Sequence, residues 1–447
     1  MSNNHFDVIA IGVGMAGQSV ARKTASAGKK VAVIDSRPYG GTCALRGCDP
    51  KKVLVGAAEI VDWQRRMTGH GITGEAHIDW GELMAFKRTF TEPVPQNLEK
   101  SLGKQGVATY YGETRFTDAN RLQVGDDTLT GDHIVIAVGA KPGDLGIPGA
   151  EHVVTSTDFL ELETLPKRVV FIGGGYISFE FAHIAARAGA EVTILHRGER
   201  PLQGFDADMV AGLVDASREV GIDVRVNTAV KAVEKQGDTL AVHTDGQTVT
   251  ADLVVHGAGR VPEIDALDLD AGGVQHDLKK GIFVNEFLQS VSNPAVYAAG
   301  DAAATEGWPL TPVAVHEGLT VASNILKGNH KTPNYLGTPS VAFTIPSLSR
   351  AGITEEEATA QDLKFTVNHK DTSSWYSSRR TNEQHSAYKV LIEDGTGKIL
   401  GAHLLGGHAG EVINMFSLAI RHGLTARDVK TGIFVHPAAS SDISYML

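Results

Sequence analysis

Apolar runs and glycine-rich turns alternate in the first half of the chain. An apolar run over 6–11 predicts a strand, the turn GVGMAG follows, a helix-compatible segment ends at Gly28, and VAVID over 31–35 predicts the next strand. Short apolar runs bounded by glycine are typical of strands buried in parallel sheets. This first glycine motif, residues 6–35, therefore predicts a strand, a turn, a helix and a strand.

The same order of elements returns in a second glycine motif, residues 168–200. RVVFIGGGYISFE predicts a strand, a glycine loop and a helix, and EVTILHRGER predicts the next strand. A repeated unit of this kind indicates two domains of the same class.

Other parts of the chain predict a helix near the first motif and a mixed C-terminal region. Residues 53–66 have helical spacing, with Ile60 placed on the apolar face. Strands are expected near 389–392 and 400–405, and a helix over 411–422. Together the patterns predict an α/β fold with two Rossmann-like three-layer dinucleotide-binding domains and a C-terminal α+β domain.

The first glycine motif carries the residues that bind a dinucleotide. Gly12, Gly14 and Gly17 let the backbone approach a pyrophosphate at the helix N-terminus, and Asp35, 21 positions after Gly14, can accept hydrogen bonds from ribose hydroxyls. The alternative is a tight structural turn. The complete motif with its terminal acid favours dinucleotide binding.

The second glycine motif differs from the first at the position of the terminal acid. The position corresponding to Asp35 is a histidine, again 21 residues after the middle glycine, and two arginines follow. An acid would repel a 2′-phosphate, whereas a basic cluster would bind one, so NADPH is favoured over NADH. The alternative is a group of solvated surface charges. The residues concerned are Gly173, Gly175, His196, Arg197 and Arg200.

The only two cysteines, Cys43 and Cys48, lie close together in GGTCALRGCDPKK. A disulfide that closes so short a loop removes little unfolded-state entropy, which favours a reactive pair over a structural staple. Regular helix geometry would place the two Cα atoms roughly 8 to 9 Å apart, beyond the ~7 Å that a disulfide allows. A bonded pair therefore requires a distorted first turn, which Gly47 and Pro50 permit.

The surroundings of the pair predict reactive thiols. A helix N-terminus and the nearby Lys51 would both lower a thiol pKa. The alternatives are two free core thiols or a metal site, but CxxxxC lacks the spacing of zinc ligands and no second Cys/His pair follows, so no metal is expected.

Composition and charge restrict the partners. The chain has 447 residues, 42% hydrophobic and 21% charged, and a formal net charge of -11, which argues against nucleic-acid and anionic-lipid partners. The apolar run from Val8 to Ala16 is too short and glycine-broken for a signal peptide or a membrane span, so a cytoplasmic protein is expected. In that reducing compartment a lone cysteine pair is more often catalytic than structural.

The combined motifs resemble a known family. GGTCxxxxC followed by PK, the two glycine motifs, AAGD and a terminal HP are similar to the FAD-dependent pyridine nucleotide–disulfide oxidoreductases, the glutathione reductase and dihydrolipoamide dehydrogenase group. The resemblance covers essentially the whole chain and implies a homodimeric NAD(P)H-dependent flavoprotein disulfide reductase. The implied domains are 1–148 and 264–333 for FAD, 149–263 for NAD(P)H and 334–447 for dimerisation.

The resemblance also assigns roles to individual residues. It implies that Cys43 attacks the substrate, that Cys48 lies against the flavin, and that Lys51 lies beside flavin N5 with Glu180 as its acidic partner. His436 would reach across the dimer as a general acid toward Cys43. Tyr176 would gate the nicotinamide pocket and Asp301 would hold the FAD ribityl chain, with Gly41, Thr42, Gly139, Gly259 and Gly300 also at the cofactors.

The chain departs from the family pattern at two places. Where HPTxxE has a glutamate, this chain has Ser441, with Asp442 one residue further on. Either Asp442 orients His436 through a local shift, which we favour slightly, or the imidazole is held less firmly. Where glutathione reductases tend to place an arginine that binds substrate, this chain has Leu319, although Arg22 matches a second substrate-contacting arginine.

The substrate class follows from the same comparison. Mercuric reductase and high-molecular-weight thioredoxin reductase are disfavoured because no additional cysteine pair exists. The prediction is an NADPH-dependent reductase of a low-molecular-weight disulfide. The alternatives are a flavin-level NAD(P)H oxidoreductase of the quinone or diaphorase type and a non-catalytic redox sensor. The segment SSWYSSRRTNEQH, with Arg379 and Arg380, is interpreted as the lining of a substrate entrance or as a solvated loop.

Overall fold

The computed structural model describes residues 4–447, which form two compact units. Compact unit 1 contains residues up to 50 together with 86–143 and 260–335, and compact unit 2 contains 51–85, 144–259 and 336–447. Each unit is thus assembled from three separate segments of the chain.

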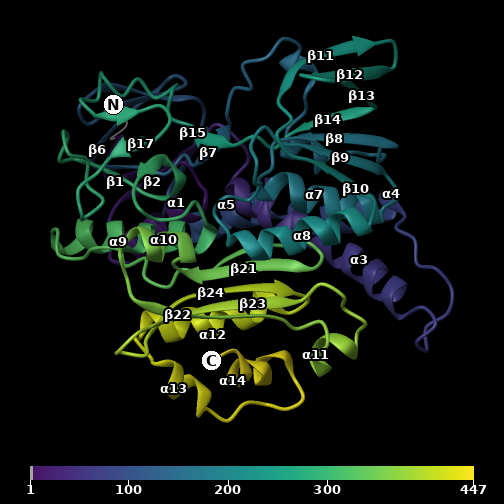
Figure 1. The fold of residues 1–447 in the computed structure, drawn as a ribbon. Coiled ribbons are helices and arrows are strands. Elements are labelled where there is room, and N and C mark those ends of the chain that lie inside the picture. Colours follow the sequence, from purple (N-terminus) through teal and green to yellow (C-terminus); the bar gives the residue numbers. More distant parts are fainter. Residues whose placement is uncertain (1–3) are drawn as a thin grey trace. The chain divides into compact units, whose positions relative to one another are not determined.

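Compact unit 1 is built on a seven-stranded sheet (Figure 1). The first glycine motif forms its centre, since β1 pairs in parallel with β2 and with β6. Along β1, Val8 and Ala10 belong to one hydrophobic cluster and Ile9 and Ile11 to another, so both faces of this strand are covered. Burial on both faces explains why the strand reads as a continuous apolar run. The strands are β1 (His5–Ile11), β2 (Val31–Asp35), β3 (Ala108–Tyr111), β4 (Thr114–Asp118), β5 (Arg121–Val124), β6 (Asp127–Ile136) and β18 (Val296–Ala298).

Two helices cover one face of this sheet. Helix α1 (Met15–Ser26) follows the glycine turn, and α9 (Thr311–Lys327) packs along it. Ala16 and Val20 of α1 and Val321 of α9 share a hydrophobic cluster with the sheet. Two further helices, α4 (Trp80–Thr91) and α5 (Val94–Lys104), are separated at Pro93.

Compact unit 2 contains the second glycine motif. Its parallel sheet has the order β10-β9-β8-β14, and α7 follows the glycine loop as predicted. A three-stranded antiparallel sheet, β11-β12-β13, belongs to the same part. The elements are α7 (Tyr176–Arg187), α8 (Ala207–Glu219), β8 (Arg168–Ile172), β9 (Glu191–Leu195), β10 (Ile222–Arg225), β11 (Val230–Gln236), β12 (Thr239–Thr244), β13 (Thr248–Ala251) and β14 (Leu253–His256).

The C-terminal part of compact unit 2 is a five-stranded antiparallel sheet. It lies between α8 on one face and α12 (Ala409–Arg421) on the other (Figure 1). This arrangement confirms the predicted fold class of two Rossmann-like domains followed by an α+β domain. The strands, in spatial order, are β20 (Ser340–Ala342), β21 (Ser347–Gly352), β24 (Ile399–Gly406), β23 (Ala387–Glu393) and β22 (Phe365–Asp371).

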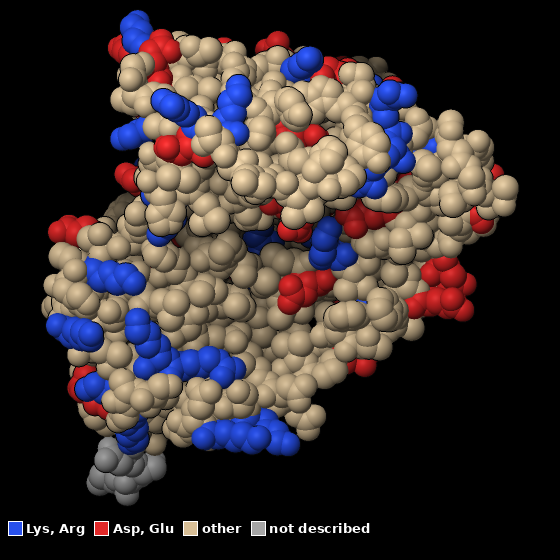
Figure 2. Space-filling model, turned by 90° about the horizontal axis from the view of Figure 1, so that it is seen from below, with Lys and Arg blue, Asp and Glu red and all other residues tan. Residues whose placement is uncertain are grey.

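The surface carries mixed charges. On the face shown in Figure 2, Lys and Arg side chains of the described residues lie at several separate places with Asp and Glu among them. Most of this face belongs to residues that are neither acidic nor basic. Among the helices within 4–447, none is long and apolar enough to cross a membrane.

Helix α3 (Cys48–Met67) exists as predicted, but its predicted apolar face is wrong. Ile60 is 68% exposed, whereas Leu54, Val55 and Ala58 are buried. Two buried charges, Lys51 and Asp62, lie on the same face as these residues because they are spaced at helical intervals.

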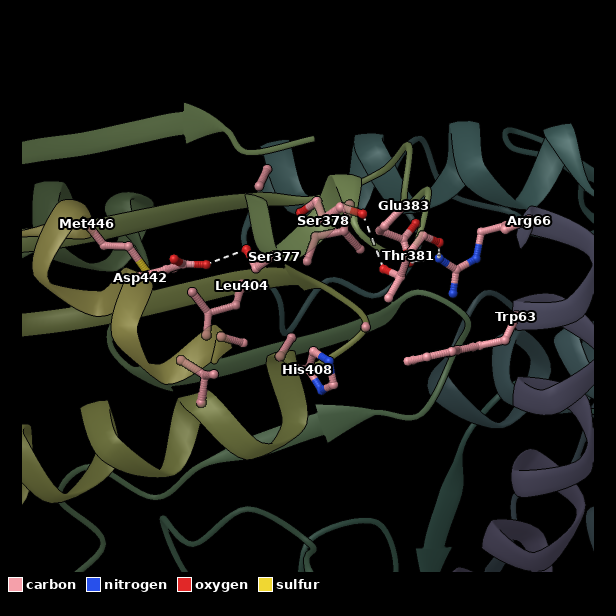
Figure 3. A pocket seen from close by; sticks show the side chains of 16 residues that line it. Trp63, Arg66, Ser377, Ser378, Thr381, Glu383, Leu404, His408, Asp442 and Met446 are labelled. Atoms are coloured by element: carbon pink, nitrogen blue, oxygen red, sulfur yellow. Dashed lines mark hydrogen bonds and ion pairs between the residues drawn. The ribbon is translucent and has the colours of Figure 1, made fainter. Parts of the chain in front are cut away.

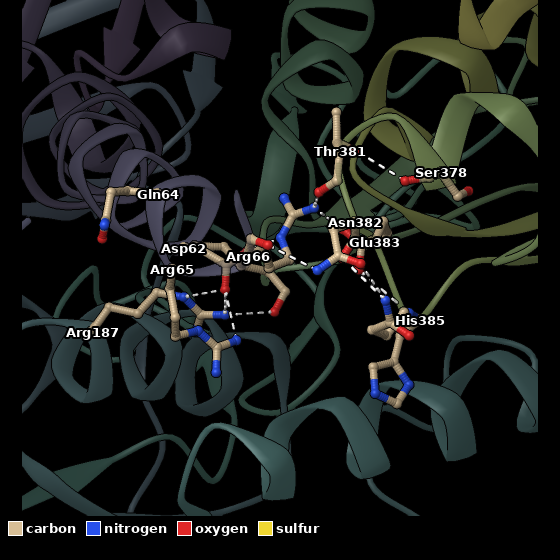
Figure 4. A network of polar contacts seen from close by, with 12 residues as sticks. Asp62, Gln64, Arg65, Arg66, Arg187, Ser378, Thr381, Asn382, Glu383 and His385 are labelled. Carbon is tan, nitrogen blue, oxygen red and sulfur yellow. Dashed lines mark hydrogen bonds and ion pairs between the residues drawn. The ribbon is translucent and has the colours of Figure 1, made fainter. Parts of the chain in front are cut away.

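Asp62 is the centre of a buried ionic network (Figure 4). Its carboxylate accepts hydrogen bonds from Arg187 of α7 at 2.7 Å and from Arg66 at 2.7 Å. Arg187 also donates to the carbonyl of Ile345 at 3.0 Å. Although burial alone would raise the pKa of Asp62, the charge of Arg187 and the hydrogen bonds hold it below its ordinary value. The network ties α3 to α7 and to the chain before β21.

We expect Asp62→Ala to lower the free energy of unfolding by about 3 to 5 kcal/mol, because it leaves two buried guanidinium groups short of a partner. Arg65 provides a matched control, since it contacts the same carboxylate at 3.3 Å from a side chain that is 54% exposed. Arg65→Ala should cost no more than about 1 kcal/mol. Urea unfolding followed by circular dichroism measures both values, and equal losses would contradict a network held by its buried partners.

Candidate active site

The first glycine motif forms a close backbone contact with the cysteine segment. Gly12 has φ +96°, and a Cβ there would lie 2.3 Å from the carbonyl oxygen of Ala137. A Cβ on Gly41, at the start of α2 (Gly41–Arg46), would lie 2.5 Å from the Cα of Gly14. Only glycine permits these approaches. The helix that carries Cys43 is therefore seated directly on the turn between β1 and α1.

This cradle fits a dinucleotide. Asp35 ends β2 and accepts a hydrogen bond from the N–H of Val13 at 2.8 Å, which brings the acid beside the glycine turn. A Cβ on Gly139 (φ +73°) would meet nothing within 4 Å, so space remains beside this backbone, and in compact unit 2 the same holds for Gly259 (φ +118°). Thr42 follows Gly41 in α2 and is exposed. The glycine turn and the carboxylate are the features that hold a pyrophosphate and a ribose.

The cysteine pair lies at a break between two helices. Helix α2 ends at Arg46, Gly47 has non-helical dihedrals (φ -152°, ψ -111°), and α3 begins at Cys48. The predicted distortion is therefore confirmed at Gly47, whereas Pro50 fits into the first turn of α3 without breaking it. Neither of the two cysteines forms a disulfide in this structure.

Polar groups contact both sulfur atoms. Cys48 Sγ lies 3.4 Å from the hydroxyl of Thr311, the first residue of α9. Cys43 Sγ lies 3.9 Å from a carboxylate oxygen of Asp49. A hydrogen bond to Cys48, together with burial, raises the pKa of the Cys43 thiol. The predicted lowering of the thiol pKa is therefore wrong for Cys43, because the contact with Cys48 and burial both favour the protonated thiol.

The predicted pair of Lys51 and Glu180 is brought together in compact unit 2. Lys51 Nζ lies 2.9 Å from Glu180 Oε1, and the two residues are 7% and 3% exposed. The same carboxylate oxygen accepts the N–H of Phe343 at 2.7 Å, and the ammonium lies 4.3 Å from the Phe343 ring centroid. A buried ion pair with these additional partners holds the lysine in one position.

The second glycine motif forms another tight turn. Gly173 has φ +108°, and a Cβ there would lie 2.4 Å from the carbonyl oxygen of Gly257. Gly175 precedes α7, whose first residue, Tyr176, is 45% exposed. The hydroxyl of Ser178 is buried without a hydrogen-bond partner among the described residues. The turn therefore has the backbone shape that suits a second dinucleotide.

Part of the basic cluster after β9 already forms contacts within the protein. Arg200 forms an ion pair with Glu356, with one contact at 3.0 Å, and the ring of His196 lies 3.0 Å from the carbonyl oxygen of Arg200. Burial lowers the pKa of His196, so its ring is neutral near neutral pH. Arg197 is exposed. The cluster is therefore less basic than the sequence suggests.

Asp301 lies where the sheet of compact unit 1 ends, beside an acid that the sequence analysis missed. Burial raises the pKa of Asp301. The neighbouring Gly300 donates its N–H to the buried Glu317 of α9 at 2.6 Å. The sequence feature that could have identified it is an acidic residue, Glu317, in the largely small and apolar segment TPVAVHEG.

His436 is exposed near the C-terminus, and Asp442 does not contact it. Its Nδ1 lies 3.5 Å from the hydroxyl of Ser441, which donates to the carbonyl of Ala438 at 2.6 Å. The Asp442 carboxylate instead accepts a hydrogen bond from Ser377 inside a pocket beside α12 (Figure 3). The structure therefore places Ser441, and not Asp442, at the ring nitrogen of His436.

The segment after Trp375 and Arg22 were both considered for substrate contact. Each already forms hydrogen bonds within the chain. Thr381, in the segment after Trp375, is buried and its carbonyl accepts a hydrogen bond from Arg66. Arg379 and Arg380 are exposed. Arg22 donates to the hydroxyl of Ser101 at 3.1 Å.

Comparisons with known proteins agree with this architecture. The family model of the pyridine nucleotide-disulphide oxidoreductases matches residues 6–318, and that of their dimerisation domain matches residues 338–447. The chain is 31% identical to a glutathione reductase of Nostoc sp. over 99% of both proteins. It is 32% identical to a mercuric reductase of Lysinibacillus sphaericus over 96% of this chain and 80% of the relative.

A solved structure has the same fold. The Cu(II) complex of the HOCl-induced flavoprotein disulfide reductase RclA from Escherichia coli superposes with a TM-score of 0.90, with 27% identity and 99% of each chain covered. Together with the glycine turns, the cysteine pair and the matched dimerisation domain, these findings define an enzyme of the flavoprotein disulfide reductase class. The chain belongs to the pyridine nucleotide-disulphide oxidoreductase family, whose members depend on FAD and use pyridine nucleotides.

Proposed function

We propose that this enzyme uses NADPH to reduce a low-molecular-weight disulfide through a redox disulfide between Cys43 and Cys48. The observation that carries the proposal is the hydrogen-bonded cysteine pair at the Gly47 break, seated on the first glycine turn. FAD supplies the two-electron exchange between NADPH and the cysteine pair. The net reaction is NADPH, a proton and a disulfide giving NADP⁺ and two thiols.

The two cysteines have different tasks in this proposal. The Cys43 thiol gives its proton to His436 of the partner subunit and its sulfur bonds to one substrate sulfur as the substrate disulfide breaks, so that the first thiol leaves with that proton. The Cys48 thiolate then bonds to the Cys43 sulfur as the mixed disulfide breaks, and the second thiol leaves with a proton taken from solvent, which restores the disulfide. The hydroxyl of Thr311, 3.4 Å from Cys48 Sγ, is placed to support the Cys48 sulfur when it carries negative charge.

Several features support a small substrate. The chain has no cysteine besides this pair, so no second pair exists to pass a metal ion or a disulfide onward. Three of the similar proteins are glutathione reductases. A reducing compartment such as the cytoplasm would suit a lone cysteine pair that works by exchange. A turnover screen with NADPH and the disulfides of glutathione, coenzyme A and lipoamide tests the proposal directly.

A second candidate function is a flavin-level NAD(P)H oxidoreductase of the quinone type. The observation that favours it is the neutral Ser441 at the ring of His436, where Asp442 instead accepts a hydrogen bond from Ser377. Full turnover by the Cys43→Ser, Cys48→Ser double variant with the physiological acceptor would support it. Flavin reduction slower than about one per second in stopped-flow would instead indicate a redox sensor.

Two-electron reduction of the purified flavoprotein should produce a long-wavelength absorption band, because a Cys48 thiolate lies against the oxidised flavin in the proposed arrangement. Cys48→Ser should abolish this band, whereas Cys43→Ser, which cannot form the disulfide, should show it before any reductant is added. Anaerobic titration with dithionite, followed by absorbance spectra, measures both variants. A parent enzyme without the band would count against the disulfide mechanism.

NADPH preference should depend on Arg197 more than on Arg200, because Arg200 is already paired with Glu356. We expect Arg197→Ala to lower kcat/KM for NADPH about 10- to 100-fold, the effect of losing one charged hydrogen bond, with little change for NADH. Arg200→Ala should change the ratio of the two values less than about fivefold. An unchanged ratio in Arg197→Ala would remove this residue from the proposed phosphate site.

Ser441 should support the proton transfer by His436. We expect Ser441→Ala to lower turnover with the disulfide about three- to tenfold, the equivalent of one weak hydrogen bond, and to leave quinone reduction unchanged. Asp442→Asn is the matched control, since its carboxylate contacts Ser377. A larger loss of disulfide turnover in Asp442→Asn than in Ser441→Ala would assign the orienting role to Asp442.

A further inference from the structure

We propose that Glu317 is a positioning residue for FAD, which holds the turn at Gly300 so that Asp301 faces the bound dinucleotide. The proposal concerns a residue of α9 and rests on the proposed role of Asp301 as the acid that holds the ribityl chain. It does not depend on which disulfide the enzyme reduces.

The carboxylate of Glu317 is buried and fully occupied. Glu317 is 1% exposed. Its Oε2 accepts the N–H of Gly300 at 2.6 Å, and its Oε1 accepts the hydroxyls of Thr305 at 2.9 Å and Tyr335 at 2.6 Å. A buried carboxylate is costly unless donors surround it, so this arrangement is a built polar site within compact unit 1. The two oxygens have separate tasks, and only one of them contacts the turn.

The backbone of the turn needs such a partner. The last sheet-type hydrogen bond of this strand runs from the N–H of Ala299 to the carbonyl of Ile136, at 3.1 Å. Gly300 then adopts φ +70°, and a Cβ there would lie 3.3 Å from the Cβ of Ala314 and 3.6 Å from that of Ala16. From Gly300 onward the sheet no longer directs the chain. The hydrogen bond to Glu317 therefore sets the direction in which the next residue, Asp301, leaves the strand.

Helix α9 is fixed relative to the dinucleotide turn. A Cβ on Gly318, the residue after Glu317, would lie 2.5 Å from the carbonyl oxygen of Ala16 in α1, so the two helix backbones are in close contact. At the start of α9, Thr311 lies 3.4 Å from Cys48 Sγ. The same helix thus contacts the helix after the first glycine turn, the redox cysteine and the turn before Asp301. Glu317 is the group through which this fixed helix reaches that turn.

The nearby Asp301 also influences Glu317. Burial and the charge of Asp301 raise the pKa of Glu317 above its ordinary value, although the hydrogen bonds to its carboxylate lower it, and burial raises the pKa of Asp301. Glu317 has its donors inside the protein. The Asp301 carboxylate is stabilised when a ligand donates hydrogen bonds to it from hydroxyl groups. A ribityl chain carries such hydroxyl groups.

The test is the dissociation constant of FAD from reconstituted apoprotein, measured by quenching of flavin fluorescence. Glu317→Leu keeps most of the side-chain volume but removes the acceptor, and we expect FAD to bind about tenfold more weakly. Glu317→Gln keeps an oxygen for the Gly300 N–H and should recover most of the affinity. Tyr335→Phe and Thr305→Val, which remove donors only from Oε1, are the matched controls and should change the affinity less than about threefold.

A double-variant cycle with Asp301→Asn separates positioning from general loss of structure. If Glu317 acts through Asp301, the variant Glu317→Leu, Asp301→Asn should bind FAD no more weakly than Asp301→Asn alone. The proposal would be overturned if the losses of FAD affinity in the two single variants multiplied in the double variant. It would also be overturned by parent-like FAD affinity in Glu317→Leu. Parent-like affinity in Asp301→Asn would overturn the role of Asp301 and this proposal with it, whereas failure to reduce disulfides would leave the affinity result standing.

Circular dichroism and the thermal midpoint of each apoprotein show whether the variants fold. If Glu317→Leu does not fold, Glu317→Asp decides the question, because it keeps the charge and withdraws the oxygen from Gly300. The same non-additive cycle with Asp301→Asn is then expected. Parent-like FAD affinity in a folded Glu317→Asp variant would overturn the proposal.

Discussion

The backbone contact between Gly14 and Gly41 is the constraint on which the chemistry of compact unit 1 depends. A side chain on Gly41 would overlap the Cα of Gly14, so the start of α2 lies directly against the turn between β1 and α1. This contact joins two functions in one place, since the turn suits a pyrophosphate and α2 leads to the cysteine pair. The position of α2 relative to the glycine turn is thereby decided by main-chain packing, which is less adaptable than side-chain packing.

The cysteines themselves depend on the interruption of a helix. An unbroken helix would hold Cys43 and Cys48 too far apart to bond, and the non-helical dihedrals of Gly47 remove that obstacle. The result is a hydrogen-bonded pair in which the pKa of Cys43 is raised. The polar contact at Cys48 suits the charged role that we propose for it, whereas Cys43 must lose its proton before its sulfur attacks.

In compact unit 2 the orientation of α3 depends on charge pairs as much as on apolar burial. Lys51 pairs with Glu180 and Asp62 pairs with Arg187, and both partners belong to α7. In the first pair the basic residue belongs to α3, and in the second pair it belongs to α7. A shift of one helix along the other would therefore bring like charges together. Buried pairs of this kind contribute little net stability but select one register. That selection explains why Ile60, apolar though it is, lies in solvent.

The sequence by itself determined the α/β class, both glycine motifs, the cysteine pair and the pairing of Lys51 with Glu180, because short-range patterns and family motifs encode them. Only the tertiary structure decided the partner of Arg200, the contact of Asp442 with Ser377 and the place of Glu317 beside Gly300. Each of these side chains meets a partner that is distant in sequence or outside any motif. The physical reason is that hydrogen bonds and ion pairs depend on angstrom-scale positions, which exist only after the chain has packed.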